Sequence, residues 1–545
     1  MLADATLIRA GLIMTATGVV SAATVRYAVD EPTGDTIFGV GFLFYLVLLA
    51  VSSSRRQSAL APPLALAAFA AIYFTGTFAT NANGLGVAIY VVAGVLAYLA
   101  TPHRFRTFAV AAVALWTPAF RLFGPDPLRG FYPLSLAVAT VLSLFFIVAM
   151  LLANTEDDEE RLRRIGLGLL AVACVARISE RHIIVASRDA IAPDDVWAFV
   201  VLAALPVLAF VPAHRRIRDA LATGVALGAY LLSSLALLIG KPYHVDSVAV
   251  VHRAGEILLG GGNPYRDVNV TEALTRFGID PALATHLLDG SPLHAYNYPA
   301  LSFLIPAPFI AAGLQDIRYI YLVEVIALVL VLLGRARVPW RPLIAAAVVG
   351  NAVISRQNVL AGVDPFWAIA TLLAFVFVAR RWWSPILMGL AIAARQGAWF
   401  FVPFYVLAVW TRSGRRSAIR ALAIAAVTAI IPNLPFFIMS PGDFLFGVTE
   451  PLLDALEPYG VGLIRFSMDG YLPFLPRGAY AVLSIAALIG FIVLLVRKRK
   501  DFPTGLFVFP SVVLWLAWRS LQNYFSFAAL FALAGDETLA APPES

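Results

Sequence analysis

Apolar runs long enough to cross a lipid bilayer repeat along most of this 545-residue chain. The sequence is 60% hydrophobic and only 13% charged, whereas soluble domains carry about 25% charged residues. Backbone groups inside a bilayer must be hydrogen-bonded within the protein, and the alternating pattern of transmembrane strands is absent here. The sequence therefore predicts an all-α fold, a polytopic transmembrane helical bundle.

Short clusters of basic residues separate the apolar runs. The formal net charge of +7 comes from these clusters and not from one continuous basic surface, so we expect contact with membrane lipids and no nucleic acid. A cytoplasmic N-terminus places the first four clusters inside: Arg55-Arg56, Arg104 with Arg106, Arg161 to Arg164 and Arg215 to Arg218. The long polar segment Lys241–Tyr298 then lies outside, in a multi-pass protein of the cell membrane.

The expected spans fall on both sides of this polar segment. Before it they lie near 7–25, 37–53, 59–77, 85–101, 107–122, 132–153, 165–185, 195–213 and 219–240. We read the first as a retained span, because no small-residue cleavage site follows it. After the polar segment they lie near 319–334, 342–355, 364–379, 419–439, 476–496, 504–518 and 523–535, while the proline-rich stretch 298–314 is too interrupted for a full crossing. Two half-length stretches, 384–394 and 397–410, meet at Arg395-Gln396.

One expected span, 165–185, is interrupted by Arg177, Glu180, Arg181 and His182. Ionisable residues inside a bilayer often mark a functional cluster. The alternative, which we favour, is that they form the outer end of a shorter helix and extend their long side chains to the interface.

The polar segment has a helical pattern of its own. Residues 246–259 carry apolar side chains at helical spacing and end in a run of glycines. Asn269 followed by Glu272 resembles a capping box, and Asp280-Pro281 is an N-cap residue before a proline at the first helical position. We therefore expect short helices lying at the membrane interface.

Asp246 is the candidate catalytic acid of this segment. It follows the outer end of a span, and His244, His252 and Arg253 are near it in sequence. The residues alone leave two readings open, an N-cap of the helix 246–259 or a general base. His252 by itself is more typical of a packed histidine. The spacing of His, Cys, Asp and Glu predicts no metal site and no cofactor, and the need for a divalent metal stays open.

Further polar residues near the ends of later spans fall on the same outer face. Charges there are costly unless they are paired or wetted. For each of these residues taken alone, an ion pair is a sufficient explanation, for example Asp364 with Arg356 or Arg395. If the whole set lies together in the fold, it indicates a binding site. Guanidinium groups in such a site suit a phosphate. The set comprises Glu324, Arg356, Gln357, Asp364, Arg395 and Asp469.

Five segments, taken together with Asp246, resemble the GT-C superfamily of membrane glycosyltransferases, in particular bacterial polyprenol-phosphate-mannose-dependent mannosyltransferases. They are HRAGEILLGGGNPYRDVN, YNYPALSFLIPAPF, NAVISRQNVLAGVDPFWAIATLLAF, MGLAIAARQGAWFFVPFYVLAVW and WRSLQNYFSFAALFAL. The resemblance covers about 217–535; residues 1–216 form an eight-span region with no assigned role, and 536–545 form a polar tail. Tyr298-Pro299-Ala300 stands where Tyr-Pro-Pro is usual, and Arg395-Gln396 where Lys is common.

The resemblance implies transfer of a sugar from a polyprenyl-phosphate donor to a lipid or glycan acceptor at the extracytoplasmic face. Asp246 would be the general base, and Arg395, with Arg356 or Arg253, would stabilise the leaving phosphate. Tyr265 and Tyr298 would pack against the sugar or lipid. The expected substrate-binding set is completed by His244, His252, Asn263, Asp364 and Gln396. A transporter or lipid flippase with a site at the membrane midplane, and a catalytically inactive assembly subunit, are the alternatives.

Overall fold

The computed structural model describes residues 4–29, 31–56, 61–65, 95–96, 98–120, 157–185, 215–239, 241–293, 295–453 and 456–540. Within these ranges the fold is almost entirely helical, as the sequence predicts. The expected spans near 59–77, 85–101, 132–153 and 195–213 lie wholly or largely outside the described residues.

Three described helices are long and apolar enough to cross a membrane: Asp4–Thr24 within α1 (Asp4–Val29), α20 (Arg415–Met439) and α23 (Arg477–Lys498). They differ in their surroundings, because 94% of the apolar window of α1 is buried, against 11% for α20 and 17% for α23. The apolar sides of α20 and α23 therefore face outward, as expected of helices in contact with lipid.

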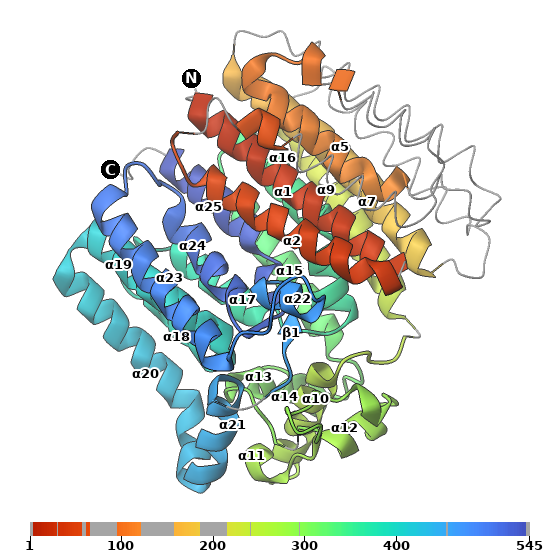
Figure 1. Cartoon of the computed structure of the whole chain (residues 1–545), viewed down its shortest axis with the longest axis vertical. Coiled ribbons are helices and arrows are strands. Elements are labelled where there is room, and N and C mark those ends of the chain that lie inside the picture. Colours follow the sequence, from red (N-terminus) through yellow and green to blue (C-terminus); the bar gives the residue numbers. More distant parts are fainter. Residues whose placement is uncertain are drawn as a thin grey trace.

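The N-terminal helices pack onto the C-terminal ones. α1 contacts α2 (Glu31–Ser52), α5 (Arg106–Phe120) and α25 (Ala528–Ala540), and α2 contacts α24 (Gly505–Trp515) (Figure 1). Arg9 of α1 and Asp536 of α25 form a buried ion pair with an Nε–Oδ1 distance of 2.5 Å. Tyr45 of α2 donates its hydroxyl to the carbonyl of Phe525. Residues from both halves of the sequence therefore share one core.

Arg177 is buried inside this bundle. It lies on α7 (Asp158–Val185) and donates to Ser234 of α9 (Arg215–Leu238) at 3.3 Å, with its guanidinium 5.4 Å from the ring centroid of Tyr230. The expectation that its side chain reaches the interface is therefore wrong. Its burial is compatible with a charge because α9 supplies a hydroxyl and an aromatic face.

The later helices follow the expected positions, with one exception. The expected span near 342–355 is broken: α16 (Arg341–Val349) ends at Val349, and the π-helical segment η5 (Ile354–Leu360) continues at 60° to it. The Asn351 side chain accepts hydrogen bonds from the N–H groups of Val353 and Ile354, as an N-cap does. The Asn351 side chain thus replaces the helical partners that these two N–H groups lose at the break. The remaining helices here are α15 (Arg318–Arg335), α17 (Phe366–Val376), α18 (Trp383–Ala394) and α19 (Val402–Ser413).

Short helices from the polar segment gather at one end of the bundle, opposite the chain ends (Figure 1). They are α10 (Asp246–Leu259), α11 (Pro264–Asp267), α12 (Val270–Arg276) and the 3₁₀ turn η3 (Pro281–Leu283). The predicted N-caps Asn269 and Asp280 accept from backbone N–H groups. The following α13 (Leu301–Leu304) and α14 (Ala307–Ala311) are too short to cross a bilayer, as expected from their prolines. α21 (Pro441–Leu453) contacts α11.

Smaller elements complete the described fold. β1 (Tyr459–Gly460) and β2 (Arg519–Ser520) pair in parallel next to α22 (Leu463–Met468). The 3₁₀ turns are η1 (His103–Phe105), η4 (Val338–Trp340), η6 (Gln396–Phe401) and η7 (Gln522–Phe525).

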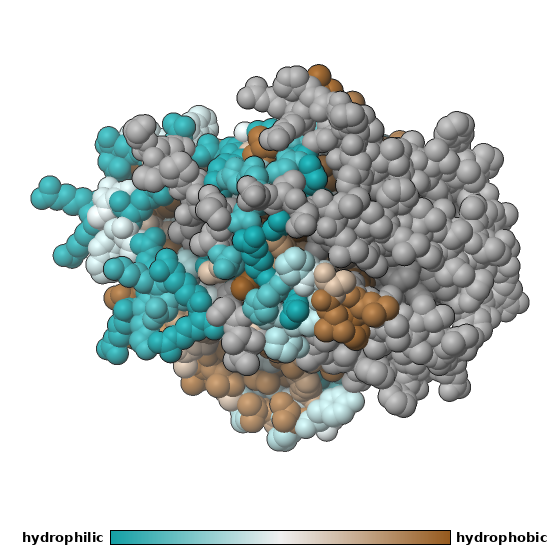
Figure 2. Space-filling model, turned by 90° about the horizontal axis from the view of Figure 1, so that it is seen from above, coloured by the Kyte–Doolittle hydropathy of each residue, from teal (hydrophilic) through white to brown (hydrophobic). Residues whose placement is uncertain are grey.

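Basic residues from several loops contact acidic residues of other segments. Arg104 pairs with Asp158, Arg337 with Glu159, and the backbone N–H of Arg55 donates to Asp501. Seen from above, much of the described surface is hydrophilic and hydrophobic residues gather along one side (Figure 2). Arg104 and Arg337 thus both bind acidic residues at the start of α7.

Candidate functional site

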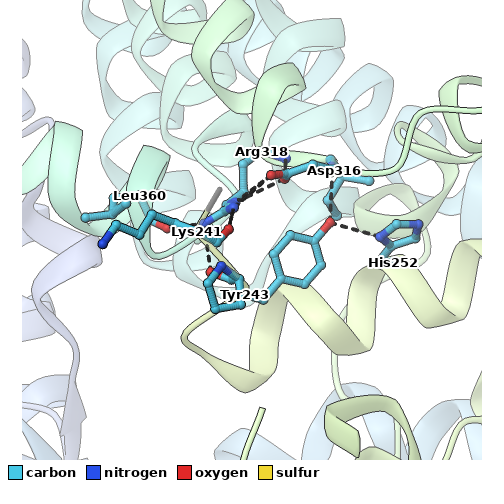
Figure 3. Close-up of polar contacts among 8 residues, drawn as sticks. Lys241, Tyr243, His252, Asp316, Arg318 and Leu360 are labelled. Carbon is cyan, nitrogen blue, oxygen red and sulfur yellow. Dashed lines mark hydrogen bonds and ion pairs between the residues drawn. The ribbon is translucent and has the colours of Figure 1, made fainter. Parts of the chain in front are cut away.

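Arg318 anchors the start of the polar segment to the bundle. Its side chain is 1% exposed and pairs with Asp316 at 2.8 Å. It also donates to the carbonyls of Lys241 at 2.6 Å and Leu360 at 2.9 Å, so one guanidinium joins the polar segment, α15 and the end of η5 (Figure 3). The bidentate geometry of a guanidinium makes such a junction rigid. The position of α10, which begins a few residues after Lys241, is therefore fixed.

Asp246 is the first residue of α10 and its carboxylate bonds to a distant part of the segment. Its Oδ2 accepts from the backbone N–H of Thr285 at 3.0 Å and from the Thr285 hydroxyl at 2.6 Å. The N-cap position belongs to Val245, whose side chain makes no capping bond. The N-cap reading of Asp246 is therefore wrong. Oδ1 of Asp246 makes no hydrogen bond within the described part of the chain, so one carboxylate oxygen is oriented and the other is open to a ligand.

Arg395 and Tyr298 form the second half of the candidate site. α18 ends at Ala394, and Arg395 adopts an extended backbone before η6. Its guanidinium lies 4.1 Å from the ring centroid of Tyr298. Burial raises the pKa of the Tyr298 phenol; the charge of Arg395 opposes this rise and the charge of Asp246 adds to it. Tyr298 is therefore within electrostatic reach of both Asp246 and Arg395.

Three of the expected substrate-binding residues form hydrogen bonds to other parts of the chain. The Tyr265 hydroxyl donates to the carbonyl of Tyr298 at 2.8 Å, and its ring packs against other aromatic rings. Gln396 donates to the carbonyls of Asn297 and Val448. Asn263 caps α11 and donates to Ser440. All three side chains thus bond to other parts of the chain, and Tyr265 and Gln396 bind backbone carbonyls at Tyr298 and Asn297.

The two expected histidines, His244 and His252, lie in different surroundings. His244 lies within electrostatic reach of Lys241, Arg318 and Arg356; partial burial and these charges lower its pKa. His252 lies on the far side of Tyr243: its Nδ1 is 2.9 Å from the Tyr243 hydroxyl, and its ring stacks on Phe277. His252 is therefore a packed histidine, as its sequence alone indicates.

Arg253 is held on the outer surface of the segment. It pairs with Glu256 at 3.1 Å and with Glu272 at 3.0 Å. Of the acids expected on the outer face, Asp469 likewise pairs with Arg465 at 2.7 Å. These salt bridges account for both residues without a ligand.

Asp364 has no salt bridge among the described residues. It is 4% exposed, and its Oδ1 accepts from the backbone N–H of Phe366 at 2.8 Å. It interacts electrostatically with Arg395 and Glu324, but the expected ion pair with Arg395 does not form. Arg395 thus has no carboxylate partner within the described part of the chain.

The most informative residues that the sequence reading missed are Thr285 and the pair Asp316 and Arg318. Thr285 lies 39 residues from Asp246, and no local pattern links the two. Arg318 stands at the start of an apolar helix two residues after Asp316, and side chains at this spacing do not face each other within a helix. The local sequence therefore indicates neither the ion pair with Asp316 nor the three backbone carbonyls that Arg318 binds.

Across the described residues, no three His, Cys, Asp or Glu side chains are grouped so that they could hold a metal ion. Comparison of the chain with protein-family models, with curated proteins and with solved structures gives no match. The resemblance to a known family therefore rests on the sequence motifs alone.

Proposed function

We propose that this chain is a glycosyltransferase that moves a sugar from a polyprenyl-phosphate donor to a lipid or glycan acceptor at the extracytoplasmic face of the membrane. The observation that carries the proposal is the arrangement around Tyr298. A carboxylate with one open oxygen, Asp246, and a buried guanidinium without a carboxylate partner, Arg395, both act on this phenol. A base and a phosphate-binding cation are the two groups that such a transfer needs.

Asp246 serves as the general base in this proposal. Its open Oδ1 accepts the proton of an acceptor hydroxyl while Thr285 holds Oδ2. The acceptor oxygen then forms a bond to the anomeric carbon of the sugar. The bond between this carbon and the phosphate oxygen breaks, its electron pair leaves with the polyprenyl phosphate, and the configuration at the anomeric carbon inverts. A positioned base of this kind contributes about 10²–10⁴ in rate.

Arg395 serves as the group that stabilises the leaving phosphate. A guanidinium that is already desolvated and held against an aromatic ring loses little on binding an anion. Its side chain is buried, with 6% of the residue exposed. Gln396, the next residue, is bonded to two backbone carbonyls and so limits movement of the Arg395 backbone. These contacts support a fixed rather than a mobile anion site.

The test is sugar transfer by the purified full-length protein and its Asp246→Asn variant. Membranes are first incubated with a panel of polyprenyl-phosphate sugars to find the donor that gives a new glycolipid. Asp246→Asn keeps the bonds from Thr285 and removes the base, so transfer is expected to fall by about 10²–10⁴. Asp280→Asn is the matched control, because Asp280 is an exposed N-cap in the same segment. Full transfer by Asp246→Asn rules out the mechanism.

A transporter or lipid flippase is the second candidate, and two observations favour it. The helix pair α16 and η5 is broken by 60°, and broken helices often line transport sites. Glu324 lies on α15, inside one of the apolar segments. Movement of a labelled polyprenyl-phosphate sugar across reconstituted vesicles without formation of a glycolipid supports this candidate over the transferase.

A further inference from the structure

A hairpin of the polar segment carries Thr285, the residue that binds the carboxylate of Asp246. The hairpin spans residues 285–293, and the backbone N–H of Leu293 donates to the carbonyl of Thr285 at 2.8 Å. Its base is buried at Leu293, whereas its tip is exposed at Leu288. A two-stranded hairpin is only marginally stable by itself. The position of Thr285 therefore depends on the contacts that hold the hairpin in place.

A second segment, the strap formed by residues 456–462, bonds to this hairpin. Leu456 and Leu287 form an antiparallel β-bridge. The backbone N–H of Glu457 donates to the carbonyl of His286 at 3.0 Å. His286 directly follows the threonine that binds the candidate base, so the strap holds the hairpin one residue away from that threonine.

Trp518 and Arg519 fix the strap to the C-terminal part of the chain. The indole Nε1 of Trp518 donates to the carbonyl of Leu456 at 2.7 Å, and its ring packs edge-on against Tyr480 of α23, with 5.4 Å between the ring centroids. Arg519, in β2, donates to the carbonyl of Glu457 at 2.8 Å. In Figure 1, β1 of the strap lies between the bundle and the short helices of the polar segment. The strap therefore connects these two parts of the fold.

Two glycines allow the strap to lie this close to the C-terminal segment. Gly460 of β1 pairs with Ser520 of β2 and has a φ of 148°, which residues with a side chain rarely adopt. A Cβ atom at Gly460 would lie 2.5 Å from the carbonyl oxygen of Ser520, and a Cβ atom at Gly462 would collide with the carbonyl oxygen of Trp515. A side chain at either position would push the two segments apart. The close contact thus depends on glycine at both positions.

We propose that the strap positions the hairpin 285–293 and, through Thr285, the carboxylate of Asp246. In this role, which rests on the proposed function, Trp518 and the backbone N–H of Glu457 are positioning groups and do not touch the substrate. A general base must stay within hydrogen-bond reach of the acceptor hydroxyl. Misplacement of a reacting group by about 1 Å can cost about 10²-fold in rate.

The alternative is that the hairpin is a lid that must leave the strap before the acceptor can enter. The contacts favour a fixed hairpin. His286 bonds to the strap, and its neighbour Thr285 bonds to Asp246. Movement of the hairpin away from the strap would therefore pull on the two hydrogen bonds that orient the base.

The first experiment measures kcat and the KM for the sugar donor in the full-length protein. Glu457→Pro removes the N–H that donates to His286, and Trp518→Phe removes the indole donor while it keeps an aromatic ring beside Tyr480. Each is expected to lower kcat by about ten- to a hundredfold. The KM for the polyprenyl-phosphate sugar should not change, because Arg395 takes no part in these contacts. Glu457→Ala is the matched control, since it keeps the N–H and alters only an exposed side chain.

The second experiment replaces the lost bond by a disulfide between Leu287→Cys and Leu456→Cys. Facing Cα atoms of antiparallel strands lie about 4.5–5.5 Å apart, within the range of a disulfide. Cys174→Ala removes the single native thiol. In Glu457→Pro, the oxidised pair should restore kcat and its reduction should abolish the recovery, which a general folding defect would not show. With Glu457 in place, the oxidised pair should leave kcat unchanged.

Hydrogen exchange gives a measurement that does not need sugar transfer. Backbone amides of residues 285–293 should exchange faster in Glu457→Pro than in Glu457→Ala, because the hairpin has lost its tie. Equal exchange, or wild-type kcat in both Glu457→Pro and Trp518→Phe, overturns the role of the strap. Loss of transfer on oxidation of the cysteine pair with Glu457 in place also overturns it and supports a lid. A wild type that transfers no sugar from any donor instead refutes the proposed function.

Discussion

The guanidinium of Arg395 lies 4.1 Å from the centroid of the Tyr298 ring, which is a cation–π contact between two segments 97 residues apart in the chain. The contact orients a buried cation that has no carboxylate partner among the described residues. Such a contact contributes about 2 kcal/mol or more when it is desolvated. An anion that enters beside Tyr298 therefore meets a guanidinium whose position is already set.

Removal of the Arg395 charge is expected to affect the donor phosphate. Arg395→Met should lower kcat/KM for sugar transfer by about 10²–10³, the usual loss when a stabilising donor is removed from a developing anion. Arg395→Lys keeps the charge without the planar stack, so it should lose less. Arg266→Met is the control, because Arg266 is an exposed partner of Asp267 on the same side of the fold. Equal activity of Arg395→Met and the wild type would exclude a role in binding phosphate.

Thr285 is expected to position the carboxylate of Asp246 without touching the substrate. Thr285→Val removes the hydroxyl donor and keeps the backbone donor, at a cost of about 1.5–3 kcal/mol, or roughly ten- to a hundredfold in kcat/KM. Thr285→Ser should restore the rate, because it restores the hydroxyl. The control is Thr275→Val, whose hydroxyl bonds within α12. If valine and serine at position 285 give the same rate and the same pH profile, the hydroxyl does not orient the base.

The junction at Arg318 is expected to contribute strongly to stability. Arg318→Met leaves Asp316 and three backbone carbonyls without their donor, and breaking a buried pair of this kind costs about 3–5 kcal/mol. Arg253→Met, at a surface pair, should cost no more than about 1 kcal/mol. Cys174 gives the readout: it is the single cysteine and is buried, so a thiol-reactive dye labels it only on unfolding. Equal unfolding temperatures for the two variants would contradict the role given to Arg318.

The stability of the folded chain is expected to fall in mild acid because of His252. Burial lowers its pKa below the ordinary value of 6.5. The Tyr243 hydroxyl accepts a hydrogen bond from the backbone N–H of Ile317. Its own O–H therefore donates a hydrogen bond to Nδ1 of His252. The folded state therefore holds the neutral ring. The contribution of the neutral His252 ring to the free energy of unfolding is fully present above about pH 6.5, the ordinary pKa of the unfolded state. It decreases as the pH falls from this value toward the lower pKa of His252 in the folded state.

The measurement is Cys174 labelling during thermal unfolding across this range of pH. His252→Phe keeps the stack on Phe277 and removes the titration, so its unfolding temperature should depend less on pH than that of the wild type. Some dependence remains in the variant, because the pKa of His244 is lowered as well. An unchanged slope in His252→Phe would show that another group is responsible.

Local features of the polar segment could be predicted from the sequence because their causes are local. The helix 246–259, the caps Asn269 and Asp280 and the proline-limited helices α13 and α14 all follow from residues within a few positions of one another. The break between α16 and η5 could not be predicted in this way. Part of its hydrogen bonding comes from Ser21, more than 300 residues away, which donates to the carbonyl of Gly350 and accepts from the N–H of Ala352.

The sequence allowed the residues of the candidate site to be selected, but it did not allow their contacts to be predicted. Asp246 and Arg395 were singled out because charges beside apolar runs are costly. Whether each charge is paired depends on tertiary contacts: Arg253 and Asp469 find partners, Arg395 finds an aromatic ring, and Asp364 finds neither expected arginine. Arg177 was misread for the same reason, since its partners lie on a different helix.

The ion pair between Arg9 and Asp536 has a consequence for biosynthesis. The two residues are 527 positions apart, so the ribosome must complete nearly the whole polypeptide before the earliest helix meets its counterion. Until then the Arg9 guanidinium, which is buried in the folded chain, has no carboxylate partner, and α1 is held only by its contacts with earlier helices such as α2 and α5. Nascent chains halted before position 536 should leave α1 open to proteolysis, and full-length chains should protect it; equal protection of both would show that α1 docks without its partner.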